Sequence, residues 1–155
     1  MKIITDCAAD LSWDEVEDLG VTVAPLFIQF PEGEVNSAEI GPDEFYDRLQ
    51  KMAPKIPTPA QPAAGIFENI YRKLAEAGDE LLSIHISSGL SGTIQSARLG
   101  AQQATETAVT VFDSMTLSGA QRFQVLAAAL ADKAGWAKDA IVSHLEHIRE
   151  NTEVI

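Results

Sequence analysis

Residues 81–97 read LLSIHISSGLSGTIQSA, and they decide the fold because they run from an apolar strand, through a hydroxyl-rich turn, into a helix. The first turn of a helix has N–H groups without internal partners and about half a positive charge, so phosphate or carboxylate groups bind there. Ser88, Ser91 and Thr93 add hydroxyls, and Gly92 lets a ligand approach the backbone. The stretch predicts a site for an anionic head group.

The same residues also allow a structural interpretation, because Ser and Thr are ordinary helix N-caps and Gly is an ordinary turn residue. Two sharper interpretations fail on spacing. A P-loop requires Lys directly after its last Gly, whereas Thr93 follows Gly92. A nucleophile elbow requires Gly-x-Ser-x-Gly, whereas Gly92 directly follows Ser91. An anion site and a plain helix cap remain as alternatives.

Length and cysteine content indicate an intracellular globular domain. A chain of 155 residues is long enough to bury roughly two-thirds of its unfolded surface. Cys7 is the single cysteine, which excludes an internal disulfide and favours a reducing compartment. Residues 1–6 reach an acid too early for a signal peptide, so we expect a cytoplasmic protein.

Charge and hydropathy restrict the partners. The formal net charge of −12 opposes binding to phosphate backbones or anionic membranes, so nucleic acid is not an expected partner. The longest apolar run, near 125–131, is far shorter than the roughly 20 residues that cross a bilayer, so no membrane span is expected. Any anion must be captured locally by amides and hydroxyls, which favours a small head group attached to an apolar body.

Strand and helix patterns alternate along the chain, which predicts an α/β fold with a mainly parallel sheet and helices on both faces. The expected strands are 2–5, 21–23, 26–30, a run from 81, and 109–112. A brief first helix is expected from the Ser12 capping box, and further helices over 42–52, 62–78, around 94–104 and 138–149. Another helix is expected to end near 134. It is apolar nearly all round, which predicts that it is covered on both sides. Residues 31–34 are expected to form a turn, and the proline-rich segment 54–62 a stiff extended connector.

Three polar turns follow expected strands, at 6–8, 87–93 and 113–118. In open parallel sheets ligands bind beyond the carboxyl ends of the strands, so these turns are expected to converge on one crevice lined by Asp6, Cys7, Asp113 and Ser114. Asp6 and Asp113 are candidate general bases, although carboxylates at such turns commonly cap neighbouring amides.

Several short motifs, in specific order and spacing, resemble the DegV family. They are Thr5–Leu11, Pro25–Leu26, Pro42–Tyr46, Gln61–Pro62, Ser87–Thr93 and Asp113–Ser114. The resemblance covers essentially the whole chain but only the first of the two domains that such proteins usually have. It therefore implies that residues 1–155 form a single α/β domain and that the usual second domain is absent from this chain.

The resemblance implies a non-enzymatic carrier that holds one long-chain fatty acid in an apolar tunnel between domains. In bacteria such proteins present the acyl group to a separate ATP-dependent fatty-acid kinase. On that analogy Ser91 donates its hydroxyl to the carboxylate, helped by amides around Gly92 and Thr93, with Ser88 nearby and Gln61 lining the crevice. The ligand is the fatty acid, and no cofactor, metal or catalytic residue is expected.

The chain departs from the family pattern at two places. The family usually has Thr-Ser before its Gln-Pro, with that Thr on the carboxylate, whereas this chain has Pro59 and Ala60. Thr58 lies one residue earlier, so either Thr58 makes the contact or the contact is missing. The family's usual Asp-Ser-Thr after the first strand is Asp-Cys-Ala here, which replaces two hydroxyls by Cys7 and Ala8.

Two rival functions come from other classes. A serine-dependent hydrolase would use Ser91 as nucleophile, Asp113 as orienting acid and His144 or His147 as base, although the glycine spacing and the helical setting of both histidines disfavour it. The other rival is a half-length interaction module that pairs with another subunit, or with itself through an exposed tunnel wall.

The single cysteine and the three histidines are each expected to have a structural role. Cys7 is either a reactive thiol or, more typically, a small buried apolar group. His144 and His147 have an i, i+3 spacing without a third anchored ligand, which favours a solvated helix flank over a metal site. His85 lies within a strand and is expected to be a hydrogen-bonded structural residue.

Overall fold

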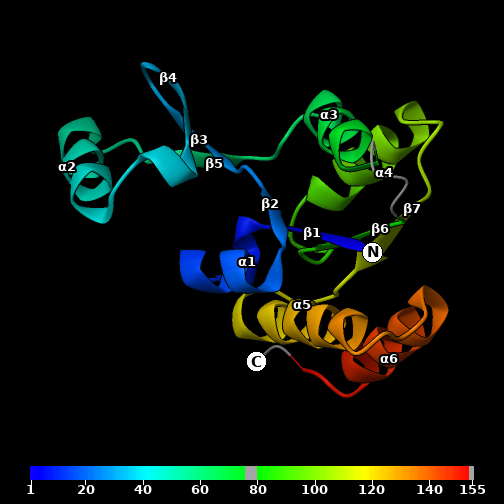
Figure 1. Cartoon of the computed structure of the whole chain (residues 1–155). Helices are drawn as coiled ribbons and strands as arrows, with labels where there is room; N and C mark the ends of the chain where they lie inside the picture. The colour runs from blue at the N-terminus through cyan, green and yellow to red at the C-terminus, as the bar shows by residue number, and fades with distance from the viewer. Residues whose placement is uncertain (76–79, 154–155) are drawn as a thin grey trace.

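The main sheet has four parallel strands in the order β2-β1-β6-β7. They are β1 (Lys2–Asp6), β2 (Thr22–Ala24), β6 (Leu81–His85) and β7 (Val109–Asp113). The computed structural model describes residues 1–75 and 80–153. Figure 1 shows the sheet between two layers of helices, so the predicted α/β fold with a mainly parallel sheet is confirmed.

Helices cover both faces because the central strands are apolar on both sides. One layer contains α3 (Ala64–Ala75) and α4 (Thr93–Gln103), and the other contains α1 (Trp13–Leu19), α5 (Ser118–Lys133) and α6 (Lys138–Glu150). Successive residues of β6 serve opposite layers. Leu81 packs with Phe67 and Tyr71 of α3, whereas Leu82 packs in the cluster that holds Val125 of α5.

Between β2 and α3 the chain leaves the main sheet and forms an antiparallel one in the order β4-β3-β5. Its strands are β3 (Phe27–Phe30), β4 (Gly33–Asn36) and β5 (Thr58–Ala60), and α2 (Pro42–Met52) precedes β5. Figure 1 shows this excursion projecting from the main body. The turn predicted over 31–34 takes only two residues, because Gly33, with φ of +144°, already begins a strand.

The proline-rich connector is extended in part: it begins with a turn in which Lys55 N donates to Met52 O, and Thr58–Ala60 form strand β5 at the edge of the small sheet. An edge strand needs hydrogen bonds on one side only, which suits Pro59 because it has no N–H. The predicted capping box is also present: Glu15 N–H donates to Ser12 Oγ at 3.3 Å, and Ser12 N–H donates to Glu15 Oε2 at 2.9 Å. The helix end expected at Gly78 lies outside the described residues.

The prediction that helix α5 is covered on both sides was wrong. Phe123 is 57% exposed and Leu130 is 59% exposed, because the sheet and α6 cover only one side of α5. Its buried side instead holds two glutamines, Gln121 and Gln124, which are fully buried and hydrogen-bonded to strand ends. None of the helices within the described ranges is long and apolar enough to span a bilayer.

Candidate functional site

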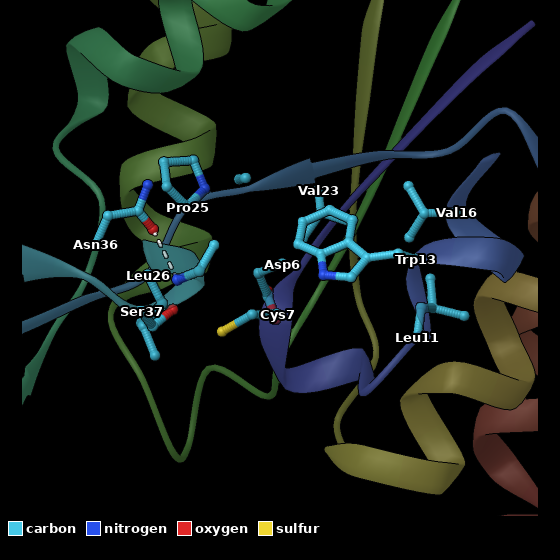
Figure 2. A pocket seen from close by; sticks show the side chains of 12 residues that line it. Asp6, Cys7, Leu11, Trp13, Val16, Val23, Pro25, Leu26, Asn36 and Ser37 are labelled. Carbon is cyan, nitrogen blue, oxygen red and sulfur yellow. Dashed lines mark hydrogen bonds between the residues drawn. The ribbon is translucent and has the colours of Figure 1, made fainter. Parts of the chain in front are cut away.

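A pocket of about 490 Å³ opens beside the carboxyl end of β1, a volume typical of small-molecule sites, which span about 300–1,000 Å³. Asp6 and Cys7 line it where β1 passes into the short 3₁₀ helix η1 (Cys7–Ala9). Figure 2 shows two walls on either side of Cys7. One wall holds Leu11, Trp13 and Val16, and the other holds Pro25, Leu26, Asn36 and Ser37.

Asp6 is held by four donors although it lines the pocket. Its Oδ1 accepts hydrogen bonds from Ala8 N at 3.0 Å and Gln121 Nε2 at 3.1 Å, and its Oδ2 accepts from Ile86 N at 3.0 Å and His85 Nδ1 at 2.9 Å. Burial alone would raise the pKa of Asp6, but the hydrogen bonds from His85, Ile86 and Gln121 outweigh burial and lower the pKa. Asp6 is therefore an ionised anchor of the strand end, and neither carboxylate oxygen is available as a general base.

Behind Asp6 a line of hydrogen bonds crosses to the α3 layer. His85 Nε2 lies 2.6 Å from Ser83 Oγ, which lies 2.9 Å from the Tyr71 hydroxyl. Burial raises the pKa of Tyr71 to about 12, although its hydrogen bond with Ser83 acts in the opposite direction. The order Asp6, His85, Ser83 matches a catalytic triad, but Ser83 and His85 are fully buried, so no substrate reaches Ser83. His85 is a hydrogen-bonded structural residue, as predicted.

The turn between β6 and α4 satisfies part of its hydrogen-bonding capacity internally. Ser91 Oγ accepts a hydrogen bond from Thr93 N at 3.2 Å and lies 2.9 Å from Thr93 Oγ1. Thr93 is 1% exposed, so its hydroxyl reaches Ser91 but not a ligand, whereas Ser91 is half-buried. Among the described residues, no protein acceptor pairs with the N–H groups of Gly92, Ile94 and Gln95. The Ser91 hydroxyl and these amides are the donors left for an anion.

The structure brings the three polar turns together at one edge of the sheet. Ile86 N donates to Asp6 in the first turn, and Ser88 N donates to Asp113 Oδ1 in the third at 3.2 Å. The lining of the pocket in Figure 2 includes Asp6 and Cys7 but none of the residues of the Ser87–Thr93 turn. The turn and the pocket are neighbours through Asp6 rather than parts of one wall.

The other predicted crevice residues have separate environments. Gln61 lies against the Ser turn, because a Cβ placed on Gly92 would fall 2.1 Å from Gln61 Oε1. Thr58 is exposed in β5, opposite Gln29 in the small sheet. Ser114 is 1% exposed and its hydroxyl donates to a backbone carbonyl, so it supports the third turn from inside.

Cys7 and the two helix histidines have structural surroundings. Burial, and then the Asp6 carboxylate, raise the pKa of Cys7, so its thiol is neutral at physiological pH and serves as pocket lining. The ring of His144 packs 5.6 Å from that of Trp136, and His147 contacts Asn151. Neither histidine pairs with Ser91 in the part of the chain that the structure describes, so the residues of the hydrolase hypothesis are not assembled. Within the same ranges no group of three His, Cys, Asp or Glu side chains could hold a metal ion.

Sequence reasoning missed the apolar wall of the pocket. Trp13 is 68% exposed at the start of α1, and Leu11 precedes the capping box. The sequence signal for this wall was Trp13, a large aromatic residue at the first position of a short acidic helix, where it does not pack in the core. Leu26 and Ser37 became neighbours of Cys7 only through the excursion of β3 and β4.

A parallel sheet with a pocket at its carboxyl edge is the architecture of α/β domains whose ligands bind at that edge. The family model described as "Uncharacterised protein, DegV family" matches residues 1–155, and the chain belongs to this family. The DegV domain-containing protein YejH of Lactococcus lactis is 36% identical over 156 residues, which cover 99% of this chain and 55% of that protein. The chain thus spans about half the length of the curated relatives it matches.

Solved structures of the family are similar throughout the chain. A DegV family protein from Thermus thermophilus, described by its fatty acid binding, has 35% identity and a TM-score of 0.87, covering 96% of this chain and 53% of that one. A stearic-acid-binding protein from Eubacterium ventriosum has 26% identity and a TM-score of 0.85, covering 94% and 52%. Fatty-acid binding is therefore a described property of the proteins that this chain resembles.

Proposed function

We propose that this chain is the first domain of a fatty-acid-binding carrier. The observation that carries the proposal is the pocket lined by Leu11, Trp13, Val16 and Leu26 at the edge of the sheet where free donors of the Ser turn also lie. Each methylene buried there contributes about 0.8 kcal/mol, so an acyl chain supplies most of the affinity. Solved relatives described as fatty-acid-binding support the same ligand class.

The carboxylate of the ligand has a local binding site despite the net charge of −12. The proposal assigns it to the Ser91 hydroxyl and the Gly92 N–H, since Thr93 can hydrogen-bond Ser91 and leave the Ser91 proton for the ligand. Hydrogen bonds to a charged group are worth about 1.5–3 kcal/mol each. Thr58 and Ser88 are exposed and remain proposed secondary contacts.

The rest of the proposed carrier lies outside these residues. The relatives are nearly twice as long, and we assign their remaining length to a second domain that closes the far side of the tunnel. The carrier would work in the bacterial cytoplasm and present the acyl carboxylate to a fatty-acid kinase. No enzymatic step is assigned to this chain.

Two tryptophans provide a test. Trp13 lines the pocket and Trp136 packs against His144 elsewhere, so the Trp136→Phe variant reports from Trp13 alone. We expect palmitic acid to produce a saturable fluorescence change in this variant and none in Trp13→Phe. Ser91→Ala should weaken binding about 10- to 100-fold, the loss of one charge-assisted hydrogen bond. Absence of a saturable change in the Trp136→Phe protein refutes the proposal.

The alternative proposal is an interaction module, for a chain that spans about 55% of the length of its relatives. In that case the chain would pair with another subunit or with itself. Size-exclusion chromatography with light scattering tests pairing with itself, because a carrier domain elutes as a monomer and binds palmitic acid, whereas a self-pairing module elutes as a dimer.

A further inference from the structure

We propose that Asp113 is a positioning residue for the head-group site, because its carboxylate fixes the Ser turn from the neighbouring strand. The inference rests on the proposed function, since it assigns the geometry of the proposed carboxylate site to a residue that never touches the ligand. Asp113 ends β7, and its Oδ1 accepts the hydrogen bond of Ser88 N at 3.2 Å.

The entrance of the Ser turn is tied to both flanking strands. Three consecutive amides donate to groups at the end of β1 or at and just after the end of β7: Ile86 N to Asp6 Oδ2 at 3.0 Å, Ser87 N to Thr116 O at 2.9 Å, and Ser88 N to Asp113 Oδ1. Asp113 makes the last of these contacts before the chain turns toward Ser91. Two carboxylates and one backbone carbonyl, all distant in the sequence, therefore set the place where the turn begins.

The body of the turn, residues 89–91, is held by hydrogen bonds to Ser87, the first residue of the turn. Gly89 N donates to Ser87 Oγ at 3.2 Å, and Leu90 N and Ser91 N donate to Ser87 O at 3.0 and 3.1 Å. No hydrogen bond from this body to the flanking strands is present in the described ranges, so the anchors at 86, 87 and 88 set its position on the strand side, and Thr93 of α4 holds Ser91 Oγ on the helix side. Releasing the Ser88 anchor lets the turn shift and moves the Ser91 hydroxyl relative to Gly92.

Asp113 is itself rigidly placed. The same Oδ1 accepts from Met115 N at 3.0 Å, which closes a tight turn in which Met115 has φ of +56°. The backbone carbonyl of Asp113 accepts a hydrogen bond from Arg149 Nη1 at 3.1 Å, and the Arg149 guanidinium lies 4.9 Å from the centre of the Phe112 ring. The turn to Met115 and Arg149 of α6 thus hold Asp113 in place. Its side chain is half-buried, so it can be replaced without leaving a cavity in the core.

The amide of asparagine reproduces this role and the shorter or longer side chains do not. Asp113→Asn keeps an Oδ1 acceptor at the same place, Asp113→Ala removes it, and Asp113→Glu keeps the charge but displaces the acceptor. The three variants distinguish geometry from charge. If Asp113 acts through its charge, Asp113→Glu should retain binding, whereas if it acts as a positioned acceptor, Asp113→Asn should retain binding.

The test measures binding of palmitic acid and of 1-hexadecanol by Trp13 fluorescence, with every variant made in the Trp136→Phe protein. We expect Asp113→Ala and Asp113→Glu to weaken palmitic acid binding about tenfold, the loss of roughly one charge-assisted hydrogen bond. Hexadecanol has no carboxylate, so its affinity should change less than about twofold in the same variants. Asp113→Asn should recover most of the loss for palmitic acid.

Two results would overturn the inference: equal weakening of acid and alcohol, which indicates a structural role alone, or unchanged acid binding in both Asp113→Ala and Asp113→Glu. Thermal unfolding checks that each variant is folded, and Asp113→Glu keeps the test decisive if Asp113→Ala is not. Failure of the parent protein to bind palmitic acid is a different result, which refutes the proposed function itself.

Discussion

Replacing Asp6 by asparagine tests the hydrogen-bond anchor at the end of β1. The carboxylate is 3% exposed and accepts four hydrogen bonds, two on each oxygen. In Asp6→Asn an NH₂ group replaces one oxygen and faces two donors. The orientation that spares His85 and Ile86 points NH₂ toward Gln121, whose amide can turn so that Oε1 accepts. Gln121 Nε2 then gives up its bonds to Asp6 and Thr5 and replaces Oε1 as the unpaired end of the amide. Ala8 N then loses its acceptor.

The magnitude follows from these contacts. One orphaned buried donor costs about 1–3 kcal/mol, and the remaining bonds to His85 and Ile86 lose the charge on their acceptor, about 1 kcal/mol more. We therefore expect the free energy of unfolding to fall by about 2–4 kcal/mol and Tm by about 4–16 °C, at about 2–4 °C per kcal/mol for a domain of this size. Urea denaturation followed by circular dichroism measures the loss, and Asp47→Asn on exposed α2 is the matched control.

The difference between the two proteins also depends on pH. The pKa of Asp6 is lowered below its ordinary value of 3.8 in the folded protein, so its ionised form stabilises the fold above about pH 4. That stabilisation disappears as pH falls through the lowered pKa, and wild type then approaches Asp6→Asn. A loss below about 1 kcal/mol at pH 7, or a difference that is the same at pH 7 and pH 3, would refute the reasoning.

Three further predictions concern packing and the buried hydroxyls. A Cβ on Gly100 would lie 2.8 Å from a backbone oxygen of α3, so Gly100→Ala should destabilise the protein by about 1–3 kcal/mol in urea denaturation. Gly92→Ala meets only the end of the Gln61 side chain and should change stability by less than about 0.5 kcal/mol; a larger loss would contradict this placement. Tyr71→Phe should cost about 1 kcal/mol because Ser83 loses a partner, and in spectrophotometric titration of the wild type one phenol should ionise near pH 12. If the Tyr71 phenol instead ionised near its ordinary pKa of 10.0, the burial of its hydroxyl would be contradicted.

The fold could be predicted where local chemistry decides it. Ser12 and Glu15 form their capping box within one helical turn, and Pro42 begins a helix, because both depend on neighbours a few residues away. Gln121 was not predicted to face the sheet, since its partners Thr5 and Asp6 lie more than 110 residues away. An alanine-rich helix also carries little information about which side is covered, and this explains the error at α5.

The candidate site divides in the same way. The strand, turn and helix around Ser91 follow from local sequence, and parallel strands bring the ends of β1, β6 and β7 to one edge. The pocket wall could not be predicted, because Trp13 shares a pocket with Leu26 only after β2 has paired beside β1 and brought the segment that follows it to the end of β1. The hydroxyl and carboxylate residues of the turns allowed the binding edge of the sheet to be predicted, whereas the apolar surface of the pocket is formed by tertiary contacts that the sequence does not reveal.

The line from Tyr71 to Asp6 makes four positions depend on one another. When the His85 ring is neutral with its proton on Nδ1 toward Asp6, Nε2 accepts from Ser83, and Ser83 in turn accepts from Tyr71. Each hydrogen bond in the line then has a fixed donor and a fixed acceptor. Replacing one member therefore leaves a donor or an acceptor of its neighbour without a partner. Ser83→Ala would leave the Tyr71 hydroxyl without its acceptor, so it should be better tolerated together with Tyr71→Phe than alone.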